Sequence, residues 1–502
     1  EECETLEIVL ADEVLDLTVT LYYTAFCDVD VITRSVRVTN HAKEPVYLTK
    51  VFSAALDLDA EDYRMLTLHG SWARERQIEY RQIGYGKQSV GSCRGESSHQ
   101  EHPFVALVSA NAGQEQGRVY GFHFVYSGNF LAQVEKNQFD SLRVVMGIHP
   151  QDFKWELKQD ETFTAPEVVM TYSDAGLGRM TRTLHDLYRK HLIRSPYKDR
   201  ERPVLINNWE ATYFDFDTEK LLAIAREAKK SGIEMLVMDD GWFGHRNDDN
   251  TSLGDWQVNE QKITGGLKRL VDQVNEIGLK FGIWFEPEMI SPDSELYRTH
   301  PDWAIALPGR TPCRSRNQYV LDLSRKEVRD YAYECVASIL RSANIAYVKW
   351  DMNRSMADVY AGNLSYDYVL GVYDFMERLC SRYPDLLLEG CSGGGGRFDA
   401  GMLYYSPQIW CSDNTDAINR TRIQYGTSFF YPVSVMGAHV SAVPNHQTGR
   451  VTSFHTRGVT AMAGTFGYEL NPALLSDEEK QQIREQIKTY KKYETLINEG
   501  TY

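Results

Sequence analysis

Lys349-Trp350-Asp351-Met352-Asn353-Arg354 is the stretch around which the fold is organised. It follows residues 344–348, an apolar run with the character of a short buried strand. Parallel α/β architectures place their chemistry at the carboxyl ends of strands, so this stretch puts an acid, two bases and one amide at such an end. A carboxylate between a lysine and an arginine is held ionised, as a nucleophile requires. A buried ion pair that caps a strand would explain the six residues equally well.

Short apolar runs alternate with helical patterns on both sides of this stretch. We expect strands at residues 204–209, 233–238, 280–285 and 345–350, with further candidates at 386–389, 408–412, 429–435 and 458–466. Helices are expected between several of them, among others at 218–231, 266–277 and 325–343. Roughly eight β→α steps over about 290 residues match a (β/α)8 TIM barrel in length and order. A doubly wound open sheet is the structural alternative.

The rest of the chain predicts a multidomain protein. Residues 1–174 alternate apolar and polar side chains with a period of two, which indicates antiparallel strands packed as a β-sandwich. Residues 175–203 are expected to be a helical linker, 204–475 the catalytic barrel and 476–502 a C-terminal helix. The chain begins without Met inside a strand-like pattern, so we expect the start of the β domain to be missing.

Composition excludes several kinds of partner. A formal charge of −16 over 502 residues argues against nucleic acid and anionic membranes. No apolar run approaches the roughly 18 residues that cross a bilayer, so no membrane association is expected. The eight cysteines have neither CxxC pairs nor metal-ligand spacing, which favours reduced thiols and a cytoplasmic protein.

Polar side chains gather directly after the predicted strands. The strands are followed by Trp209-Glu210, Asp239-Asp240-Gly241-Trp242-Phe243, Trp284-Phe285-Glu286-Pro287-Glu288, the opening stretch, the 389–399 segment and Trp410-Cys411-Ser412-Asp413-Asn414-Thr415-Asp416. Acids in loops are usually solvated and tryptophans are usually core, but solvated charge would not repeat at successive strand ends. A ring of acids, tryptophans and one lysine at a barrel mouth indicates a neutral, hydroxyl-rich ligand.

Two short runs in the sequence resemble ligand-binding loops, but neither has the spacing that such a loop needs. The four glycines at 393–396 lack the Walker spacing and the strand–helix context of a dinucleotide site, so they favour close approach of the backbone to a ligand. The acidic run at 247–250 lacks the later Gly and Glu of an EF-hand, and a polar loop explains it. No metal and no cofactor is expected.

Five motifs together carry a family resemblance: residues 238–243 (MDDGWF), 284–289 (WFEPEM), 349–354 (KWDMNR), 391–399 (CSGGGGRFD) and 412–416 (SDNTD). In order and spacing they resemble the signature set of the bacterial α-galactosidases of glycoside hydrolase family 36. The likeness runs continuously from about residue 200 to 470, and the β-rich front fits that family's N-terminal antiparallel β-supersandwich. The resemblance also implies that a further C-terminal β-sandwich of that family is missing from this chain.

The resemblance implies a retaining hydrolase that removes terminal α-linked galactose from oligosaccharides such as melibiose and raffinose. It makes Asp351 the nucleophile and Asp413 the general acid/base. Asp416 is the competing candidate for the acid/base, and its alternative interpretation is a residue that caps a helix. Positions that resemble the galactose-binding subsite are Trp209, Asp239, Asp240, Trp284, Arg316, Lys349, Cys391 and Gly394.

The chemistry expected of this pair is a double displacement. A retaining pair of carboxyl groups lies roughly 5–5.5 Å apart, and Lys349 and Arg354 are expected to keep Asp351 ionised. An α-N-acetylgalactosaminidase of the same fold, a galactosyl-transferring enzyme of the raffinose type and, more remotely, a non-catalytic galactose-binding lectin are the alternatives. The resemblance also implies a homo-oligomer, a tetramer, in which the β domain helps wall a neighbour's site.

Overall fold

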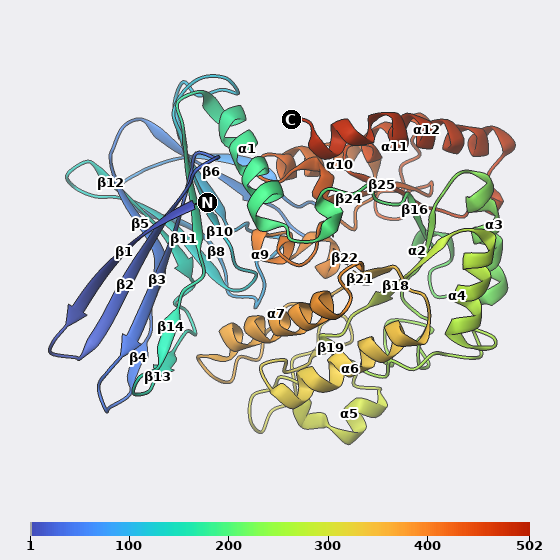
Figure 1. Cartoon of the computed structure of the whole chain (residues 1–502), viewed down its shortest axis with the longest axis horizontal. Coiled ribbons are helices and arrows are strands. Elements are labelled where there is room, and N and C mark those ends of the chain that lie inside the picture. The colour runs from blue at the N-terminus through green and yellow to red at the C-terminus, as the bar shows by residue number, and fades with distance from the viewer. Residues whose placement is uncertain (1–2, 502) are drawn as a thin grey trace.

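The computed structural model of the chain describes residues 3–501 and has two large parts, an N-terminal β domain and a closed parallel barrel. Figure 1 shows the sheets of the β domain, in blue and cyan, beside the helix-wrapped barrel in green to red. This is the predicted fold class, a β-sandwich followed by a TIM barrel, and closure of the barrel rules out the doubly wound open sheet.

The β domain is built on a nine-stranded antiparallel sheet. Its order is β1-β2-β3-β15-β10-β9-β6-β7, with β14 paired to β3. The strands are β1 (Cys3–Asp12), β2 (Leu17–Phe26), β3 (Val31–Asn40), β6 (Tyr63–His69), β7 (Gln77–Gln82), β9 (Phe104–Ser109), β10 (Val119–Phe124), β14 (Thr162–Thr164) and β15 (Val168–Ser173). The middle of this sheet is buried on both faces, because Val105 and Leu107 of β9 pack into the core between the sheets while Phe104 and Ala106 pack into the core shared with the barrel. Strand β1 at the edge is exposed along its whole length.

A smaller sheet completes the sandwich. Its order is β11-β12-β5, formed by β5 (Phe52–Asp59), β11 (Phe130–Lys136) and β12 (Ser141–Ile148), and β8 (Gly86–Ser92) lies beside β11. A further pair joins β4 (Val46–Leu48) to β13 (Trp155–Leu157). Inward side chains of both sheets, among them Phe122 and Phe130, share one apolar core.

A helical segment links the two domains. It comprises α1 (Gly176–Leu187), a π-helical turn η1 (Tyr188–Leu192) and a 3-10 turn η2 (Pro196–Lys198). The apolar stripe of α1, which includes Met180 and Leu184, packs into the same core as the barrel. The linker is therefore part of the packed structure and fixes the β domain against the barrel.

Eight parallel strands close the barrel in sequence order. They are β16 (Leu205–Asn207), β17 (Met235–Met238), β18 (Lys280–Phe285), β21 (Tyr347–Trp350), β22 (Leu387–Gly390), β23 (Gln408–Trp410), β24 (Met436–Ser441) and β25 (Thr465–Glu469). Closure is made by pairing of β16 with β25, with Leu205 opposite Gly467. All residues of the barrel strands are buried except Lys280, the first residue of β18. Burial on both faces explains the nearly continuous apolar runs.

The expected strand at 429–435 is wrong, and the one at 458–466 starts too early, since only its last two residues fall in β25. Residues 429–435 are the turn that follows α10 (Ala417–Ser428) and the 3-10 turn η4 (Val433–Val435), and the seventh strand is β24. The segment 458–466 begins inside α11 (Phe454–Ala461), and the eighth strand is β25. Short buried helical segments and buried strands have the same apolar composition, so periodicity over so few residues did not separate them.

Several of the helices around the barrel begin at a side-chain cap. They are α2 (Trp209–Thr212), α3 (Thr218–Lys230), α4 (Gly266–Ile277), α5 (Glu295–Thr299), α6 (Lys326–Ser342), α7 (Leu364–Arg382), α8 (Ser392–Gly395), α9 (Ala400–Leu403), α10, α11 and α12 (Asp477–Glu499). Asp217 caps α3, and Ser476 and Glu479 form the predicted capping box of α12. Among residues 3–501 no helix is long and apolar enough to cross a membrane.

The remaining short elements lie in the barrel loops. They are β19 (Met289–Ile290), which pairs with β20 (Tyr319–Val320), and two 3-10 turns, η3 (Pro301–Trp303) and η5 (Pro472–Leu474). The β19–β20 pair ties the segment after β18 to the loop that carries Arg316. This pairing brings residues near 316 over the carboxyl ends of the barrel strands, where the site described below is found.

Candidate active site

A cavity of about 550 Å³ opens at the carboxyl ends of the barrel strands. The barrel contributes most of its wall, including Trp209, Asp239, Asp240, Trp284, Arg316, Lys349, Asp351 and Asp413. The β domain contributes Trp72, Arg94, Glu96, His99 and Gln100. Eight of the ten residues that the sequence singled out therefore line one cavity.

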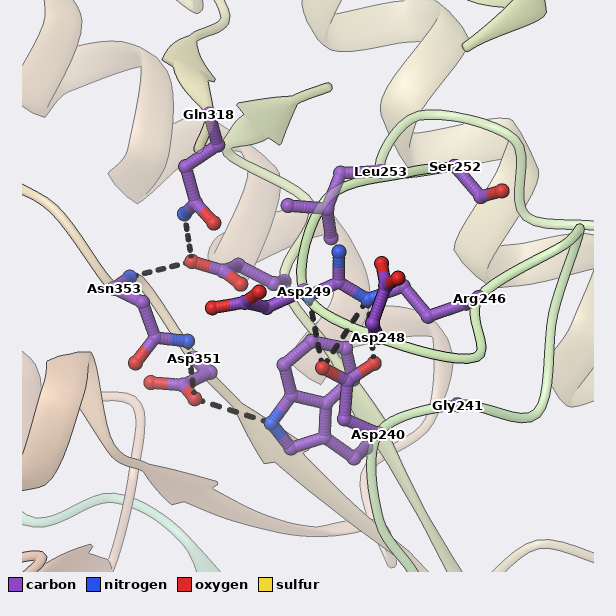
Figure 2. Close-up of polar contacts among 12 residues, drawn as sticks. Asp240, Gly241, Arg246, Asp248, Asp249, Ser252, Leu253, Gln318, Asp351 and Asn353 are labelled. Carbon is purple, nitrogen blue, oxygen red and sulfur yellow. Dashed lines mark hydrogen bonds and ion pairs between the residues drawn. The ribbon is translucent and has the colours of Figure 1, made fainter. Parts of the chain in front are cut away.

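Asp351 lies directly after β21 and is held by four hydrogen bonds. Its Oδ2 atom accepts from Trp284 Nε1 at 3.1 Å and from Asn353 Nδ2 at 2.8 Å. Its Oδ1 atom accepts from the backbone N–H groups of Met352 and Gly393, both at 2.9 Å. Figure 2 shows Asn353 beside Asp351 with this bond drawn. A carboxylate held by four donors is fixed in one orientation and favoured in its charged form.

The charge state of Asp351 is set by its neighbours rather than by its burial. Burial alone would raise its pKa, but the charge of Lys349, the N–H of Gly393 and the charge of Arg316 together hold the pKa below its ordinary value. Lys349 is itself buried, which would lower its pKa, and the carboxylate of Asp239 raises the pKa well above its ordinary value. The cavity thus contains an ionised carboxylate beside a fixed ammonium group.

Asp413 follows β23 and faces the cavity between two indole rings. Its Oδ1 atom accepts from Trp410 Nε1 at 3.2 Å, and its Oδ2 atom accepts from Trp72 Nε1 at 2.9 Å. Gly394 lies against Asp413 so closely that a Cβ atom there would be 2.3 Å from the Asp413 backbone nitrogen. Since Gly393, the residue before it, binds Asp351, the two carboxyl groups flank one turn of the glycine loop.

Two further carboxylates, at the end of β17, are held by cations. Asp239 Oδ2 accepts from Lys349 Nζ at 2.9 Å and from Asn207 Nδ2 at 2.6 Å. Asp240 binds the guanidinium of Arg246 through both oxygens, at 2.9 to 3.2 Å, as Figure 2 shows. Such double ion pairing fixes the plane of a carboxylate. The remaining lone pairs of both carboxylates are available to hydroxyl groups of a ligand.

The charge of Arg316, rather than that of Arg354, acts on Asp351. Arg316, in the loop before β20, donates from Nη1 to Asn353 Oδ1 at 2.7 Å and its charge lowers the pKa of Asp351. Arg354 instead donates to main-chain oxygens, including that of Gln318 at 3.1 Å. The expectation that Arg354 keeps Asp351 ionised is therefore wrong, because its side chain turns away to hold the loop.

Cys391 and Gly394 are not among the residues that line the cavity. Cys391 precedes α8, is buried, and burial raises the pKa of its thiol well above the ordinary value. Gly394 has a φ of +77°, a conformation that glycine adopts without strain. Asp416 does not line the cavity: its Oδ1 accepts from the backbone N–H groups of Ile418 and Asn419 and caps α10, as its alternative interpretation predicts.

Some cavity residues were missed from the sequence. Those from the β domain sit in the loops at 70–76 and 93–102, which interrupt the period-two pattern with polar residues and glycine. That interruption was the available signal. In the barrel, His446 was missed. Its Nδ1 atom lies 3.2 Å from Glu210, and this bond is the main cause that raises the pKa of His446. Glu210 also accepts a hydrogen bond from Thr415 Oγ1 at 2.6 Å.

Glu286, which follows β18, is buried and close enough to the nucleophile candidate Asp351 for the two charges to interact. It accepts from Gln318 Nε2 at 2.6 Å and from the backbone N–H of Asn353. Burial, together with the charge of Asp351, raises the pKa of Glu286 to about 7. Within the described part of the chain, no three His, Cys, Asp or Glu side chains gather in a way suited to a metal ion.

A cavity with an ionised carboxylate on one side and a second carboxyl group across a glycine loop has the components of glycoside hydrolysis. The closed barrel, with its site at the carboxyl strand ends, fits the same class. Fold and site together define a glycoside hydrolase.

Comparison with known families identifies the particular one. The Melibiase family matches residues 162–500, and the glycosyl hydrolase family 36 N-terminal domain matches residues 1–158. The chain belongs to glycosyl hydrolase family 36, as the motif resemblance implies.

Its relatives include proteins described as α-galactosidases. The bifunctional α-galactosidase/sucrose kinase AgaSK of Mediterraneibacter gnavus is 64% identical over the whole chain, which spans 54% of that protein. The α-galactosidase AgaA of Geobacillus stearothermophilus is 55% identical over the whole chain, which spans 70% of it.

Solved structures agree with this. The galactosidase domain of AgaSK superimposes with a TM-score of 0.99, covering 100% of this chain and 70% of that one. A variant of AgaA in complex with raffinose, 55% identical, also superimposes with a TM-score of 0.99, covering 100% of this chain and 71% of that one.

Proposed function

We propose that this chain catalyses hydrolysis of terminal α-linked galactose with retention of configuration, with Asp351 as nucleophile and Asp413 as general acid/base. The observation that carries the proposal is the glycine loop, in which Gly393 binds one carboxylate and Gly394 lies against the other. This places both groups around one small space, as two-step glycoside hydrolysis requires. The names of the relatives support galactose as the sugar.

The first step forms a covalent glycosyl-enzyme. Asp351 attacks the anomeric carbon with an oxygen lone pair while Asp413 donates its proton to the leaving oxygen, so the aglycone departs as a neutral alcohol. The hydrogen bonds to Asp351 from Trp284 and Gly393 keep its lone pair aimed at one point. In the second step Asp413, now ionised, takes a proton from water, which attacks the same carbon and frees Asp351.

Recognition of galactose is assigned to the cation-paired acids. Asp239 and Asp240 accept hydrogen bonds from sugar hydroxyls, Lys349 and Arg316 donate to them, and Trp209 flanks the mouth of the cavity. A site built on buried acceptors discriminates against a sugar that leaves them unpaired. Raffinose and melibiose carry a terminal α-linked galactose and are the substrates that we expect. Raffinose is bound in the structure of the related AgaA variant.

The test is hydrolysis of 4-nitrophenyl α-galactoside and the matching α-N-acetylgalactosaminide by the wild type, Asp351→Ala and Asp413→Ala. We expect release from the galactoside only, lost in Asp351→Ala. For Asp413→Ala we expect that azide restores turnover of this activated substrate, because a nitrophenolate leaves without protonation while azide replaces the activated water.

Each other outcome overturns a distinct part of the proposal. Preference for the acetamido sugar would overturn the choice of sugar and keep the mechanism. Transfer of galactose to a second sugar instead of water would make the enzyme a transglycosylase. Binding without release from either substrate would make the protein a lectin, and full activity of Asp351→Ala would remove that residue from the mechanism.

We also propose that the protein is cytoplasmic and acts as a homotetramer. The cysteines of the described residues are all free, which suits a reducing compartment. Strand β1 at the edge of the large sheet exposes apolar side chains, among them Leu6 and Val9, which suits a subunit contact. Sedimentation of the active enzyme tests the assembly, and a fully active monomer would refute it.

A further inference from the structure

His99 of the β domain forms a hydrogen bond to the glycine that binds Asp351. It lies in the 93–102 loop after β8, is half-buried, and lines the cavity. Its Nε2 atom is 2.8 Å from the backbone oxygen of Gly393. A carbonyl oxygen only accepts, so the imidazole donates and Nε2 carries the proton.

Gly393 connects this histidine to Asp351. The N–H of the same glycine donates to Asp351 Oδ1 at 2.9 Å. His99 therefore binds the carbonyl group of Gly393, and Asp351 binds its N–H group. Gly393 adopts φ +60° and ψ +37°. Glycine has no side chain to lock its backbone and populates several conformations at little cost. Its orientation, and with it the direction of the N–H toward Asp351, therefore depends on the bonds that its backbone makes.

The protonation state of His99 suits this task. Burial lowers its pKa, although the bond to Gly393 and the charge of Asp413 act in the opposite direction, while Arg76 and Arg94 add to the lowering. The ring is thus neutral near neutral pH, and a single N–H is available, which the Gly393 oxygen fixes on Nε2. A neutral donor adds no charge beside the nucleophile.

Other bonds from the β domain to this loop end away from Asp351. Arg76 Nη1 donates to the oxygen of Gly395 at 3.1 Å, and Ser98 donates its N–H to the oxygen of Gly396 at 2.8 Å. They fasten the loop as a whole, and His99 is the donor that acts on the residue bound to the nucleophile.

We propose that His99 is a positioning residue for Asp351, acting across the domain boundary through Gly393. The proposal rests on the proposed function, since it takes Asp351 to be the nucleophile. Without the donor, Gly393 turns away, Asp351 loses a hydrogen bond and its attack on the anomeric carbon slows, whereas binding of the sugar to Asp239 and Asp240 is unaffected.

Two amide variants test this with minimal change of shape. In His99→Gln the amide nitrogen reaches the position of Nε2 and restores the donor, whereas in His99→Asn it is withdrawn by one methylene group. Both are uncharged and polar, so a difference between them reports the hydrogen bond. His99→Leu is the third variant, which keeps volume and removes the donor.

A chemically matched control is available in the same chain. His185, on α1, donates from Nε2 to the backbone oxygen of Ser428 at 2.8 Å, the same kind of contact between separate elements. Burial lowers the pKa of His185 to about 3, so its ring is neutral too. It does not line the cavity. His185→Gln and His185→Asn therefore show what loss of an equivalent bond does to stability alone.

The measurement is the rate at which a 5-fluoro-α-galactosyl fluoride labels the enzyme. In this reaction an Asp351 oxygen forms a bond to the anomeric carbon as fluoride leaves, so the rate depends on the nucleophile and needs no proton from Asp413. We expect labelling to fall about tenfold to a hundredfold in His99→Asn and His99→Leu, since misplacement of a reacting group by about 1 Å costs that much. His99→Gln should label close to the wild-type rate, and the His185 variants should not differ from wild type.

The outcomes separate the two proposals. Equal labelling of wild type, His99→Asn and His99→Leu would overturn the role of His99 and leave the proposed function intact. Slower labelling of His99→Gln and His99→Asn to the same degree would also overturn it, because the restored donor would have had no effect. A wild-type enzyme that is neither labelled nor able to cleave galactosides would overturn the proposed function.

Discussion

Gly394 offers a sharp test of how tightly the acid/base candidate is held. In Gly394→Ala the new Cβ would lie 2.3 Å from the backbone nitrogen of Asp413 and 2.8 Å from its Cγ. Ordinary contacts begin near 3.4 Å, so Asp413 must move by about 1 Å. A displacement of about that size in a catalytic group costs on the order of a hundredfold in rate.

Gly393→Ala is the matched control, because it introduces the same methyl group one residue earlier. Gly393 also has a positive φ, of 60°, but its Cβ would meet its nearest neighbours at 3.6 Å, an ordinary contact. Both variants pay roughly 1–2 kcal/mol for a side chain in the left-handed region. Gly394→Ala adds overpacking of about 1–3 kcal/mol.

The assay is kcat/KM for 4-nitrophenyl α-galactoside, with thermal unfolding of both variants. We expect Gly394→Ala to lose about a hundredfold in kcat/KM, mostly in kcat, and to unfold at a lower temperature than Gly393→Ala. We expect Gly393→Ala to lose less than about tenfold. Equal losses in the two folded variants, or full activity of Gly394→Ala, would refute the argument that contact with Asp413 makes glycine necessary at 394.

Three further changes test other contacts of the site. Trp72→Phe removes one indole donor from the acid/base and should lower kcat more for a poor leaving group than for 4-nitrophenol; a loss independent of the leaving group would contradict this. Arg246→Met leaves Asp240 buried without its cation, so KM should rise and the free energy of unfolding fall by about 3–5 kcal/mol, measured by steady-state kinetics and urea denaturation; unchanged values would show that the pair is dispensable. His446 has a pKa raised by Glu210, so its stabilising contribution is present below its unfolded pKa near 6.5 and lost as pH rises through the folded pKa. The thermal midpoint of His446→Asn should therefore fall below that of wild type at pH 6 and approach it at pH 9, and a constant difference across that range would contradict the linkage.

The sequence predicted the barrel because its strand ends repeat. Six of the eight barrel strands lie where apolar runs precede polar motifs, as at Asp351, and the helix at 266–277 has the predicted bounds. The last two strands were misplaced because the buried turn at Phe429 and the short helix at Gly458 have the same apolar composition as a buried strand.

The barrel part of the site was predictable and the β-domain part was not. Strand-end motifs stay local in sequence, so Asp239 and Asp413 could be named as candidates. Trp72 and His99 reach the cavity only through contacts that span hundreds of residues, and nothing local marks their direction. The side chain of Arg354 turned away for a similar reason, since main-chain oxygens of a distant loop satisfy it.

Closure of the barrel by pairing β16 with β25 sets the order in which the protein can assemble on the ribosome. The first strand of the barrel waits for its partner until nearly all of the barrel has been translated, because Leu205 pairs with Gly467. The β domain finds its partners within its own first third of the chain and so can fold while the barrel is still being made. The loops of the β domain would then be folded before the glycine loop that they contact. The incomplete barrel, with its exposed strand edges, is the intermediate that chaperones would bind.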